Sequence, residues 1–323
     1  MPSPSTSLAT LRPDLGGSFE EFDLAMDRQG FVGHRVLTVL ESMKASGPFG
    51  KIPIEQLLQN PDTLRAPGSG YSRGKFTFTT DSFATVEHGH EEPVDDSESA
   101  MYRDFFDAEL IGAQRAIDAV LRNAEKRIAS AVFDATVWTG SALTTAVSIA
   151  WSAAATAKPI DDVEAAVQKV YSGSGLWPNA LIINRKVFRN LRNVLQIVDR
   201  IKYQGFVDVR PGQITEAAMS QVFDLNVIVA GGSKNTATEG QAAALSPIWS
   251  DANAMVAKIA ITADIREPAI GRTIHWAEDG SSIGGTVESY RDEAVRSDII
   301  RVRHQVDEKI LYPQAGHLLS NIT

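Results

Sequence analysis

The side chains best suited to chemistry are concentrated in residues 87–98, a stretch that holds six acids and two of the chain's six histidines. Paired carboxylates can act as general acid and base when a walled pocket shifts their pKa values. His88-Gly89-His90-Glu91-Glu92 also offers ligands that zinc accepts, but both histidines would have to converge with a distant third ligand. The density of charge fits a solvated, exposed loop better than a catalytic pocket or a metal site.

Other catalytic and cofactor patterns are missing from the sequence. There is no G-x-x-x-x-G-K-[ST] phosphate loop and no G-x-S-x-G nucleophile elbow. Gly231-Gly232 and Gly284-Gly285 lack the third glycine and the following helix of a dinucleotide site, which leaves them as turns. The chain has no cysteine, so disulfides and thiolate metal sites are excluded. The sequence predicts no catalytic, cofactor-binding or metal-binding residue and favours a protein that is not an enzyme.

The amino-acid composition excludes further classes of protein. The chain has 323 residues, 43% of them hydrophobic, which is enough for one large core or two modest ones. The formal net charge of −9 argues against a dedicated nucleic-acid-binding surface. No apolar run is long enough to span a membrane, and the N-terminus lacks the pattern of a signal peptide. Synthesis in a cytosol is therefore expected.

Two elements would position the acidic stretch. Before it, residues 73–79 alternate aromatic with polar side chains, including Arg73, Lys75, Phe76 and Phe78, and predict one strand of an extended hairpin that turns at residues 80–82. After it, the spacing of Asp95 and Glu98 fits a capping box, and apolar residues recur at steps of three and four as far as Ala135. The pattern predicts one helix of about 40 residues and about 55 Å. A spine of that length beside a projecting hairpin suits a flat shell subunit better than a compact enzyme.

The remaining segments predict an arm, an inserted domain and a final set of strands. Residues 1–18 predict a flexible arm, Phe19 to Asp27 a short helix, and Gly30 to Leu40 a strand. Residues 139–263 alternate helices with short strands, which is typical of a small α/β domain. On the predicted strand 298–306, His304 shares the apolar face and is expected to be a buried core histidine. Arg301 and Arg303 share the other face, where three roles remain open: pairing with the acids, touching nucleic acid, or simple solvation.

The order of these parts resembles the major capsid proteins of tailed bacteriophages, which have the Hong Kong 97-type shell fold. The resemblance covers almost the whole chain. It rests on segments that are individually weak but occur in the family's order, namely residues 30–37, 73–76, 91–96, 248–251, 288–293, 298–303 and 315–318.

The resemblance implies an α+β fold divided into five parts. Residues 1–50 would be the N-terminal arm, 51–96 the extended loop, 97–137 the spine helix of the peripheral domain, 138–263 the axial domain, and 264–323 the return to the peripheral sheet. The implied function is self-assembly through pentamers and hexamers into an icosahedral head around double-stranded DNA. The implied location is the virion, after assembly in the host cytoplasm. The implied partners are further copies of the chain, packaged double-stranded DNA through non-specific contact, and scaffolding, portal and decoration proteins. No membrane is involved.

Contact between subunits is the site that this resemblance implies. The residues expected to make it are Arg73, Lys75, Phe76, Phe78, Glu87, Glu91, Glu92, Asp95, Asp96, Arg301 and Arg303. Lys75 lies in the loop where some relatives form a Lys–Asn isopeptide bond, but no partner for it can be assigned, so the bond is not predicted.

Two alternatives remain open. An encapsulin shares the fold but encloses protein cargo, which sequence alone does not distinguish from DNA. A soluble α/β oligomeric enzyme would use residues 139–263 as its active domain and would form a compact dimer or tetramer.

Overall fold

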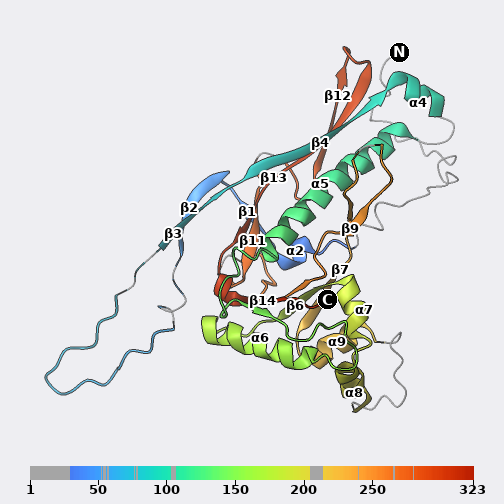
Figure 1. Cartoon of the computed structure of the whole chain (residues 1–323). Coiled ribbons are helices and arrows are strands. Elements are labelled where there is room, and N and C mark those ends of the chain that lie inside the picture. The colour runs from blue at the N-terminus through green and yellow to red at the C-terminus, as the bar shows by residue number, and fades with distance from the viewer. Residues whose placement is uncertain are drawn as a thin grey trace.

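The computed structural model describes residues 30–51, 53, 56, 58–75, 77, 79–102, 107–203, 214–238, 240–264, 266–278 and 280–323. The arm predicted for residues 1–18 and the helix predicted for Phe19 to Asp27 lie outside these residues, as do Phe76 and Phe78. The described chain has two main sheets, one in an elongated upper region and one in a helix-rich lower region (Figure 1).

The upper sheet, here called the peripheral sheet, is organised around one long strand. It consists of β1 (Val39–Ser42), β4 (Val86–Asp95), β11 (Gly271–Trp276), β12 (Thr286–Asp292) and β13 (Ser297–Ile310). β13 pairs antiparallel with β11, β12 and β4, and β1 extends the sheet by pairing parallel with β11. Along β13, Val302, His304 and Val306 are buried while Arg301, Arg303 and Gln305 are only half-buried, so the predicted two-faced strand is confirmed.

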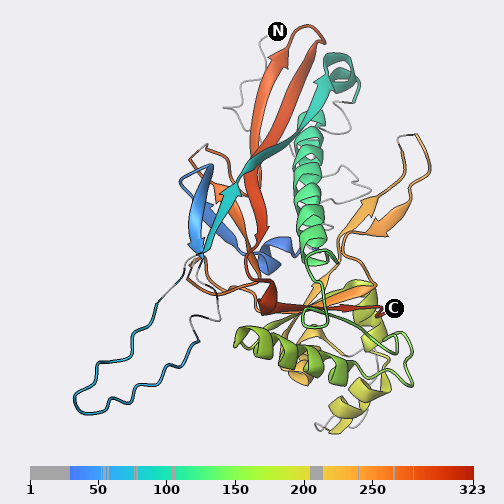
Figure 2. The same ribbon diagram turned by 60° about the vertical axis from the view of Figure 1, so that its left-hand side comes forward.

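Helix α5 (Ala108–Val132) lies along this sheet (Figures 1 and 2). At its middle, Ala116 and Val120 pack on Val302 of β13 in a small apolar cluster. Nearer its C-terminal end, Ile128 and Val132 belong to the much larger core of the lower region. One helix therefore holds the two sheets together.

The lower sheet, here called the axial sheet, is buried on both faces. It consists of β5 (Thr144–Ala146), β6 (Ala180–Asn184), β7 (Asn226–Ala230), β10 (Asn253–Ala257) and β14 (Gly316–Ser320), in the order β5-β14-β10-β6-β7. One face packs on helices α6 (Pro159–Ser174), α7 (Arg185–Leu191), α8 (Leu195–Tyr203) and α9 (Glu216–Phe223). The other face packs on the end of α5 and on the short helix α2 (Gly33–Val36). All five residues of β6 are buried as a result.

The predicted helix of about 40 residues is wrong. The structure has a short helix, α4 (Asp96–Tyr102), and then the 25-residue α5. Asp107 causes the restart: its backbone is extended (φ −87°, ψ 105°), and its carboxylate accepts hydrogen bonds from the amides of Glu109 and Leu110. At 1.5 Å per residue α5 is about 38 Å long, which is still enough to join the two sheets.

The predicted hairpin with a turn at residues 80–82 is also wrong. These residues lie inside β3 (Thr79–Ala84), which pairs antiparallel with β2 (Ser46–Lys51). A tight hairpin turn requires a positive φ, and no residue of this segment has one. The described residues among 73–77 form no strand, so the loop that joins β2 to β3 is much longer than the sequence pattern indicated.

Three further assignments differ from the sequence analysis. The predicted strand over Gly30 to Leu40 is the helix α2 followed by β1, because a buried carboxylate described below binds the first amides of α2. His88 and His90 lie in β4 rather than in an exposed loop. β14 joins the axial sheet between β5 and β10, whereas all of residues 264–323 had been expected in the peripheral sheet.

Candidate intersubunit surfaces

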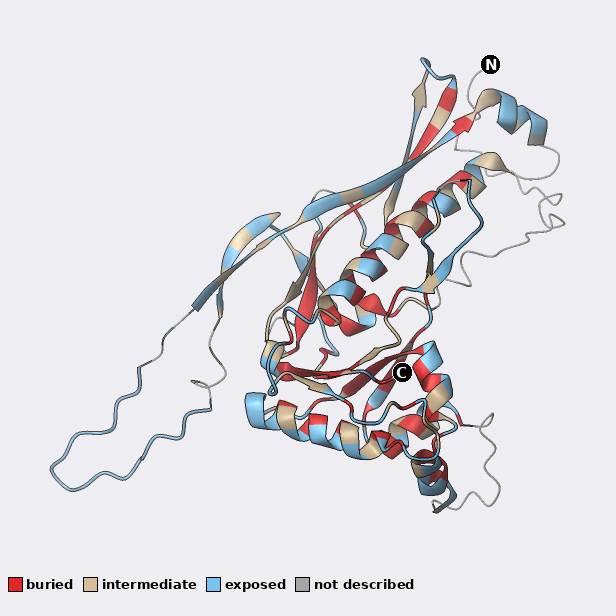
Figure 3. Ribbon diagram, in the orientation of Figure 1, coloured by how far each residue is buried: buried red, intermediate tan, exposed pale blue. Residues whose placement is uncertain are grey.

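The most exposed described segment is the loop of residues 58–75, which leaves the body of the molecule between β2 and β3 (Figure 3). It carries apolar side chains that no core covers: Leu64 is 88% exposed and Tyr71 is 74% exposed. The guanidinium of Arg65 lies 4.7 Å from the centre of the Tyr71 ring, and its Nε donates to the Ser69 carbonyl at 2.8 Å. Exposed aromatic and aliphatic groups of this kind are typical of a contact surface.

The root of this loop, in contrast, is tied to the body. The Lys309 ammonium binds the Asp81 carboxylate at 2.5 Å and the Ser82 carbonyl, and it lies 5.6 Å from the centre of the Phe49 ring. The hydrogen bond from Lys309 lowers the pKa of Asp81. On the neighbouring strand, the Lys51 ammonium donates to the Leu311 carbonyl and lies 4.5 Å from the centre of the Tyr312 ring. The loop is thus anchored where it leaves the sheet, and its far part has no contact with a core.

The acidic stretch lies on β4, where strand geometry sends alternate side chains to opposite faces of the sheet. Glu91 pairs with Arg301 of β13 at 2.6 Å, and the Arg301 guanidinium lies 5.0 Å from the centre of the Tyr290 ring. Arg303 pairs instead with Glu288 at 3.0 Å. Of the roles left open for the two arginines, pairing is therefore the one observed, and only Arg301 pairs with an acid of the 87–98 stretch.

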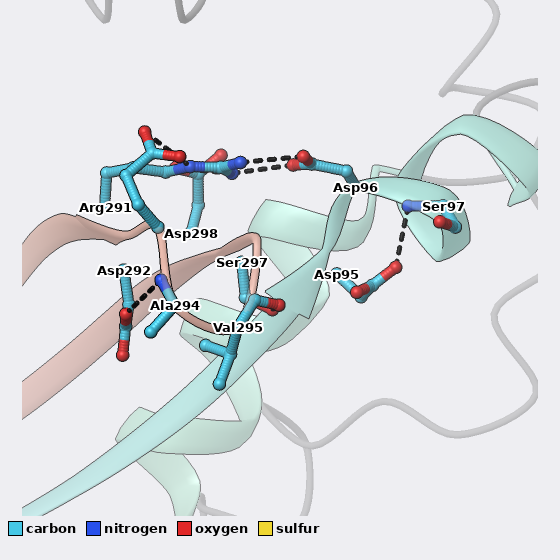
Figure 4. Close-up of polar contacts among 10 residues, drawn as sticks. Asp95, Asp96, Ser97, Arg291, Asp292, Ala294, Val295, Ser297 and Asp298 are labelled. Atoms are coloured by element: carbon cyan, nitrogen blue, oxygen red, sulfur yellow. Dashed lines mark hydrogen bonds and ion pairs between the residues drawn. The ribbon is translucent and has the colours of Figure 1, made fainter.

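The end of the stretch caps α4 and binds an arginine (Figure 4). The Asp95 carboxylate accepts from the Ser97 amide at 2.7 Å, which confirms its predicted capping role, although on a shorter helix than expected. Asp96 accepts two hydrogen bonds from Arg291, at 2.6 and 2.7 Å. This bidentate pair lowers the pKa of Asp96 and raises that of Arg291.

The structure therefore divides the predicted contact residues into two groups. Glu91, Glu92, Asp96, Arg301 and Arg303 each form an ion pair within the chain. Arg73, Lys75 and Glu87 are exposed and form no ion pair with another described residue. No sequence pattern indicated that Arg291 pairs with Asp96, since the two residues are 195 positions apart.

Three histidines, His34, His88 and His304, lie near a half-buried ion pair between α5 and β13. Arg127 binds Glu308 with its shortest contact at 2.8 Å, and its Nη2 lies 3.3 Å from His304 Nε2. His304 is fully buried with Nδ1 3.3 Å from the Ile283 carbonyl, which confirms the predicted core histidine. Burial lowers the pKa of His304 to about 4, so the ring is neutral and can accept from Arg127. Burial also lowers the pKa values of His88 and His34.

The two sheet regions meet at a buried carboxylate, Glu125 of α5. It is 3% exposed and accepts from the amides of Val32 and Gly33, at 2.9 and 2.8 Å, and from Nε1 of Trp249 at 2.6 Å. Gly33 is needed there, since a Cβ at this position would lie 2.6 Å from the carboxylate. Burial raises the pKa of Glu125, and the three hydrogen bonds oppose that shift. The sequence patterns had missed this joint, because its partners are distant along the chain.

Within the described residues, no cluster of three or more histidine, cysteine or acidic side chains could hold a metal ion. In the same part of the chain, no helix is both long enough and apolar enough to cross a membrane. The surfaces described above combine ion pairs between distant parts of the chain with one long exposed loop.

The chain was compared with protein-family profiles and with curated proteins. No protein-family profile matches the chain. A curated relative, the major capsid protein of Burkholderia phage BcepMu, is 24% identical over 307 residues and covers 90% of this chain and 91% of its own.

Solved structures are similar over nearly the full length. A phage-related protein from Bordetella bronchiseptica matches with a TM-score of 0.64 and 19% identity, covering 93% of this chain and 96% of its own. The capsid protein of cyanophage P-SCSP1u matches with a TM-score of 0.57 and 11% identity, covering 88% and 86%. This chain has the Hong Kong 97-type capsid fold. The predicted α+β class and the resemblance to tailed-phage major capsid proteins are both confirmed.

The same capsid fold is found in an encapsulin from Synechococcus elongatus, which matches with a TM-score of 0.53 and 8% identity and covers 94% of this chain and 96% of its own. At these identities the structural likeness shows the fold alone. The curated relative is what favours the phage family over the encapsulins.

Proposed function

We propose that the chain is the major capsid protein of a tailed phage. It would self-assemble through pentamers and hexamers into an icosahedral head that encloses double-stranded DNA. The observation that carries this proposal is the loop of residues 58–75. Its root is held by Lys309 and Lys51, while Leu64 and Tyr71 near its far end have no core to pack against.

The mechanism is association rather than catalysis. A closed shell repeats each contact many times by symmetry, so contacts that are individually weak together make a stable particle. Leu64 and Tyr71 would supply apolar anchors on a neighbouring subunit, and Arg73, Lys75 and Glu87 would supply charges that orient the contact. Phe76 and Phe78 remain proposed contact residues in the same stretch.

The ion pairs on the peripheral sheet have a different role in this proposal. Because Glu91, Asp96, Arg301 and Arg303 each have a partner within the chain, they would stiffen the sheet on which a neighbouring subunit rests. Asp95 caps α4 and would fix that end of the sheet in the same way. The five-part division into arm, loop, spine, axial domain and returning strands is retained, with β14 assigned to the axial sheet.

The virion is the proposed location, with assembly in the host cytoplasm. Scaffolding, portal and decoration proteins remain proposed partners. No cofactor is proposed.

Negative-stain microscopy of the expressed chain, together with light scattering, tests the proposal. Closed shells or capsomer-sized rings support it, whereas a compact dimer or tetramer contradicts it and favours the enzyme alternative. Analysis of the contents of native particles then separates the two kinds of shell. DNA supports the phage head, and a single enriched protein cargo would identify an encapsulin instead.

A further inference from the structure

The charged side chains of α5 are sorted by sign. Beyond its first turn the helix has two acids, and both are buried: Asp118 is 8% exposed and Glu125 is 3% exposed. Glu125 is held by the joint described above, and Asp118 accepts two hydrogen bonds from Arg122, both at 3.0 Å. The charged side chains that this part of the helix presents to solvent are therefore basic.

These basic side chains form one row. Arg115 and Lys126 are eleven residues apart, which places them on a single face of a helix with 3.6 residues per turn. Arg122 lies between them on this face, where Asp118 and the Ser233 carbonyl hold its guanidinium. From Arg115 to Lys126 the row is about 16 Å long at 1.5 Å per residue. Arg115 is 63% exposed and makes one contact of 3.5 Å with Glu92. Lys126 is exposed and forms no ion pair with a described residue.

A cleft borders the row on each side. The cleft towards β4 has a volume of about 520 Å³ and is lined by His88, His90, Asn123, Lys126, Arg127 and Ser130, without an acid. The cleft on the other side has a volume of about 670 Å³ and lies against the hairpin of β8 (Ser233–Asn235) and β9 (Leu245–Pro247), where Lys234 adds a further basic side chain. Its one acidic lining residue, Asp118, is the partner of Arg122. Among the described residues Lys234 has no ion-pair partner.

This face differs in charge from the chain as a whole, whose formal net charge is −9. A basic row of this kind complements a linear polyanion. Double-stranded DNA carries about one negative charge per 1.7 Å of its axis, so a row of this length lies opposite several phosphates. Asn123 and Ser130 could donate hydrogen bonds to phosphate oxygens, as such side chains commonly do in protein–DNA interfaces.

We propose that the face of α5 carrying Arg115 and Lys126, with Lys234 beside it, contacts the phosphate backbone of double-stranded DNA without reading its sequence. The inference rests on the proposed function in one respect, because it makes this face the one turned towards the enclosed DNA. It also assigns the contact to residues that the sequence analysis had not singled out. Arg301 and Arg303, which the sequence had suggested, are engaged by Glu91 and Glu288.

The test measures binding of a short fluorescein-labelled DNA duplex to the unassembled chain, isolated by size exclusion, by fluorescence anisotropy at several salt concentrations. The variant combines Arg115→Gln, Lys126→Gln and Lys234→Gln. The matched control combines Lys44→Gln, Arg189→Gln and Arg200→Gln, which removes three exposed positive charges elsewhere.

The control is expected to bind like the wild type, and the α5 variant to bind at least about tenfold more weakly at low salt. Each lost phosphate contact removes about 0.9 from the slope of log affinity against log salt concentration, so the slope should fall by about 2 to 3. The single variant Lys126→Gln, at an exposed position, should lower the slope by about 0.9, which is about one third of the fall expected for the triple variant. It replaces the triple variant in the test if that protein fails to fold.

Three results would overturn the inference: wild-type chain that does not bind the duplex, equal losses in variant and control, or binding of polyglutamate in preference to DNA. The last result would point to an acidic protein partner instead. Particle formation is scored separately by microscopy. Shells with α5-independent DNA binding would refute this inference alone, and α5-dependent binding without shells would refute the proposed function alone.

Discussion

The axial and peripheral sheets have the same number of strands but are completed differently. β6 in the axial sheet is buried at every position, with Leu181 and Ile183 in one apolar core and Ala180 and Ile182 in another. The peripheral sheet has α5 on one face, where its separate apolar cluster is small. Its other face carries ion pairs such as Glu91–Arg301 and leads to the exposed loop.

The two sheets are expected to differ in how much they contribute to the stability of a single subunit. Apolar burial contributes about 25 cal/mol per Å², so the axial cores provide most of the stability of a single subunit. Exposed ion pairs contribute little, with a median of about 0–1 kcal/mol. In the proposed function, the peripheral sheet and its loop are the parts that a neighbouring subunit would cover. The predictions below test this division.

The largest effect is expected in the axial core. Trp151 is fully buried, and its Nε1 donates to Asp162 at 2.9 Å. Trp151→Ala should lower the free energy of unfolding by about 3–5 kcal/mol, through lost burial and the cavity that remains. The control is Tyr290→Ala on the peripheral sheet, where the side chain is 42% exposed and the loss should stay below about 1 kcal/mol. Urea denaturation of the unassembled chain measures both. Equal losses would contradict the division between the two sheets.

A somewhat smaller effect is expected at the joint between the sheets. Glu125→Ala leaves three buried N–H groups without an acceptor and should cost about 3 kcal/mol. Glu125→Gln keeps one acceptor oxygen and should fall between Ala and the wild type.

The pH dependence of Glu125 has a definite sign. Burial raises its pKa above the ordinary value of 4.5, so the folded state binds more protons than the unfolded state just above pH 4.5. Wild-type stability should therefore fall as the pH rises from 4.5 to the raised pKa, and this component should be missing in Glu125→Gln. Identical pH profiles for the two proteins would contradict the burial of the carboxylate.

His304, on the peripheral sheet, should make stability depend on pH in the opposite direction. Its pKa of about 4 lies below the ordinary 6.5, so the unfolded state binds more protons between these values. Stability should rise with pH across this window by up to about 3 kcal/mol and be lost as the pH falls towards 4. Urea titrations of wild type and His304→Gln at several pH values isolate the contribution, because both proteins retain Glu125, His88, Arg127 and Glu308. A difference between the two that does not change with pH would show that His304 does not titrate as described.

The axial region was largely predictable from sequence because its signals are local. Pro159 begins α6, and Gly175 ends it with a φ of +69°. Asn184 accepts from the Lys186 amide and caps α7, and a position directly after a short apolar strand is typical of such a cap. The apolar run of β6 is likewise typical of a buried strand.

The peripheral region was harder to predict because its determinants are distant along the chain. The apolar spacing predicted one continuous helix as far as Ala135, but the side chain of Asp107 caps a new one. Asp96 has its bidentate partner, Arg291, 195 residues away, and Glu125 binds Trp249 124 residues away. Such pairs leave no periodic signal. Loop residues such as Arg73 and Lys75 were predicted as contacts from the family resemblance, and their role stays a prediction.

We propose that the loop of residues 58–75 serves assembly and contributes little to the stability of its own subunit. Its most direct test replaces residues 61–70, all exposed, with Gly-Gly and compares the variant with the wild type. Sedimentation velocity should show shells or capsomers for the wild type and only smaller species for the variant, with the same urea midpoint for the two unassembled chains. Closed shells from the variant, or a clearly lower midpoint, would contradict the account.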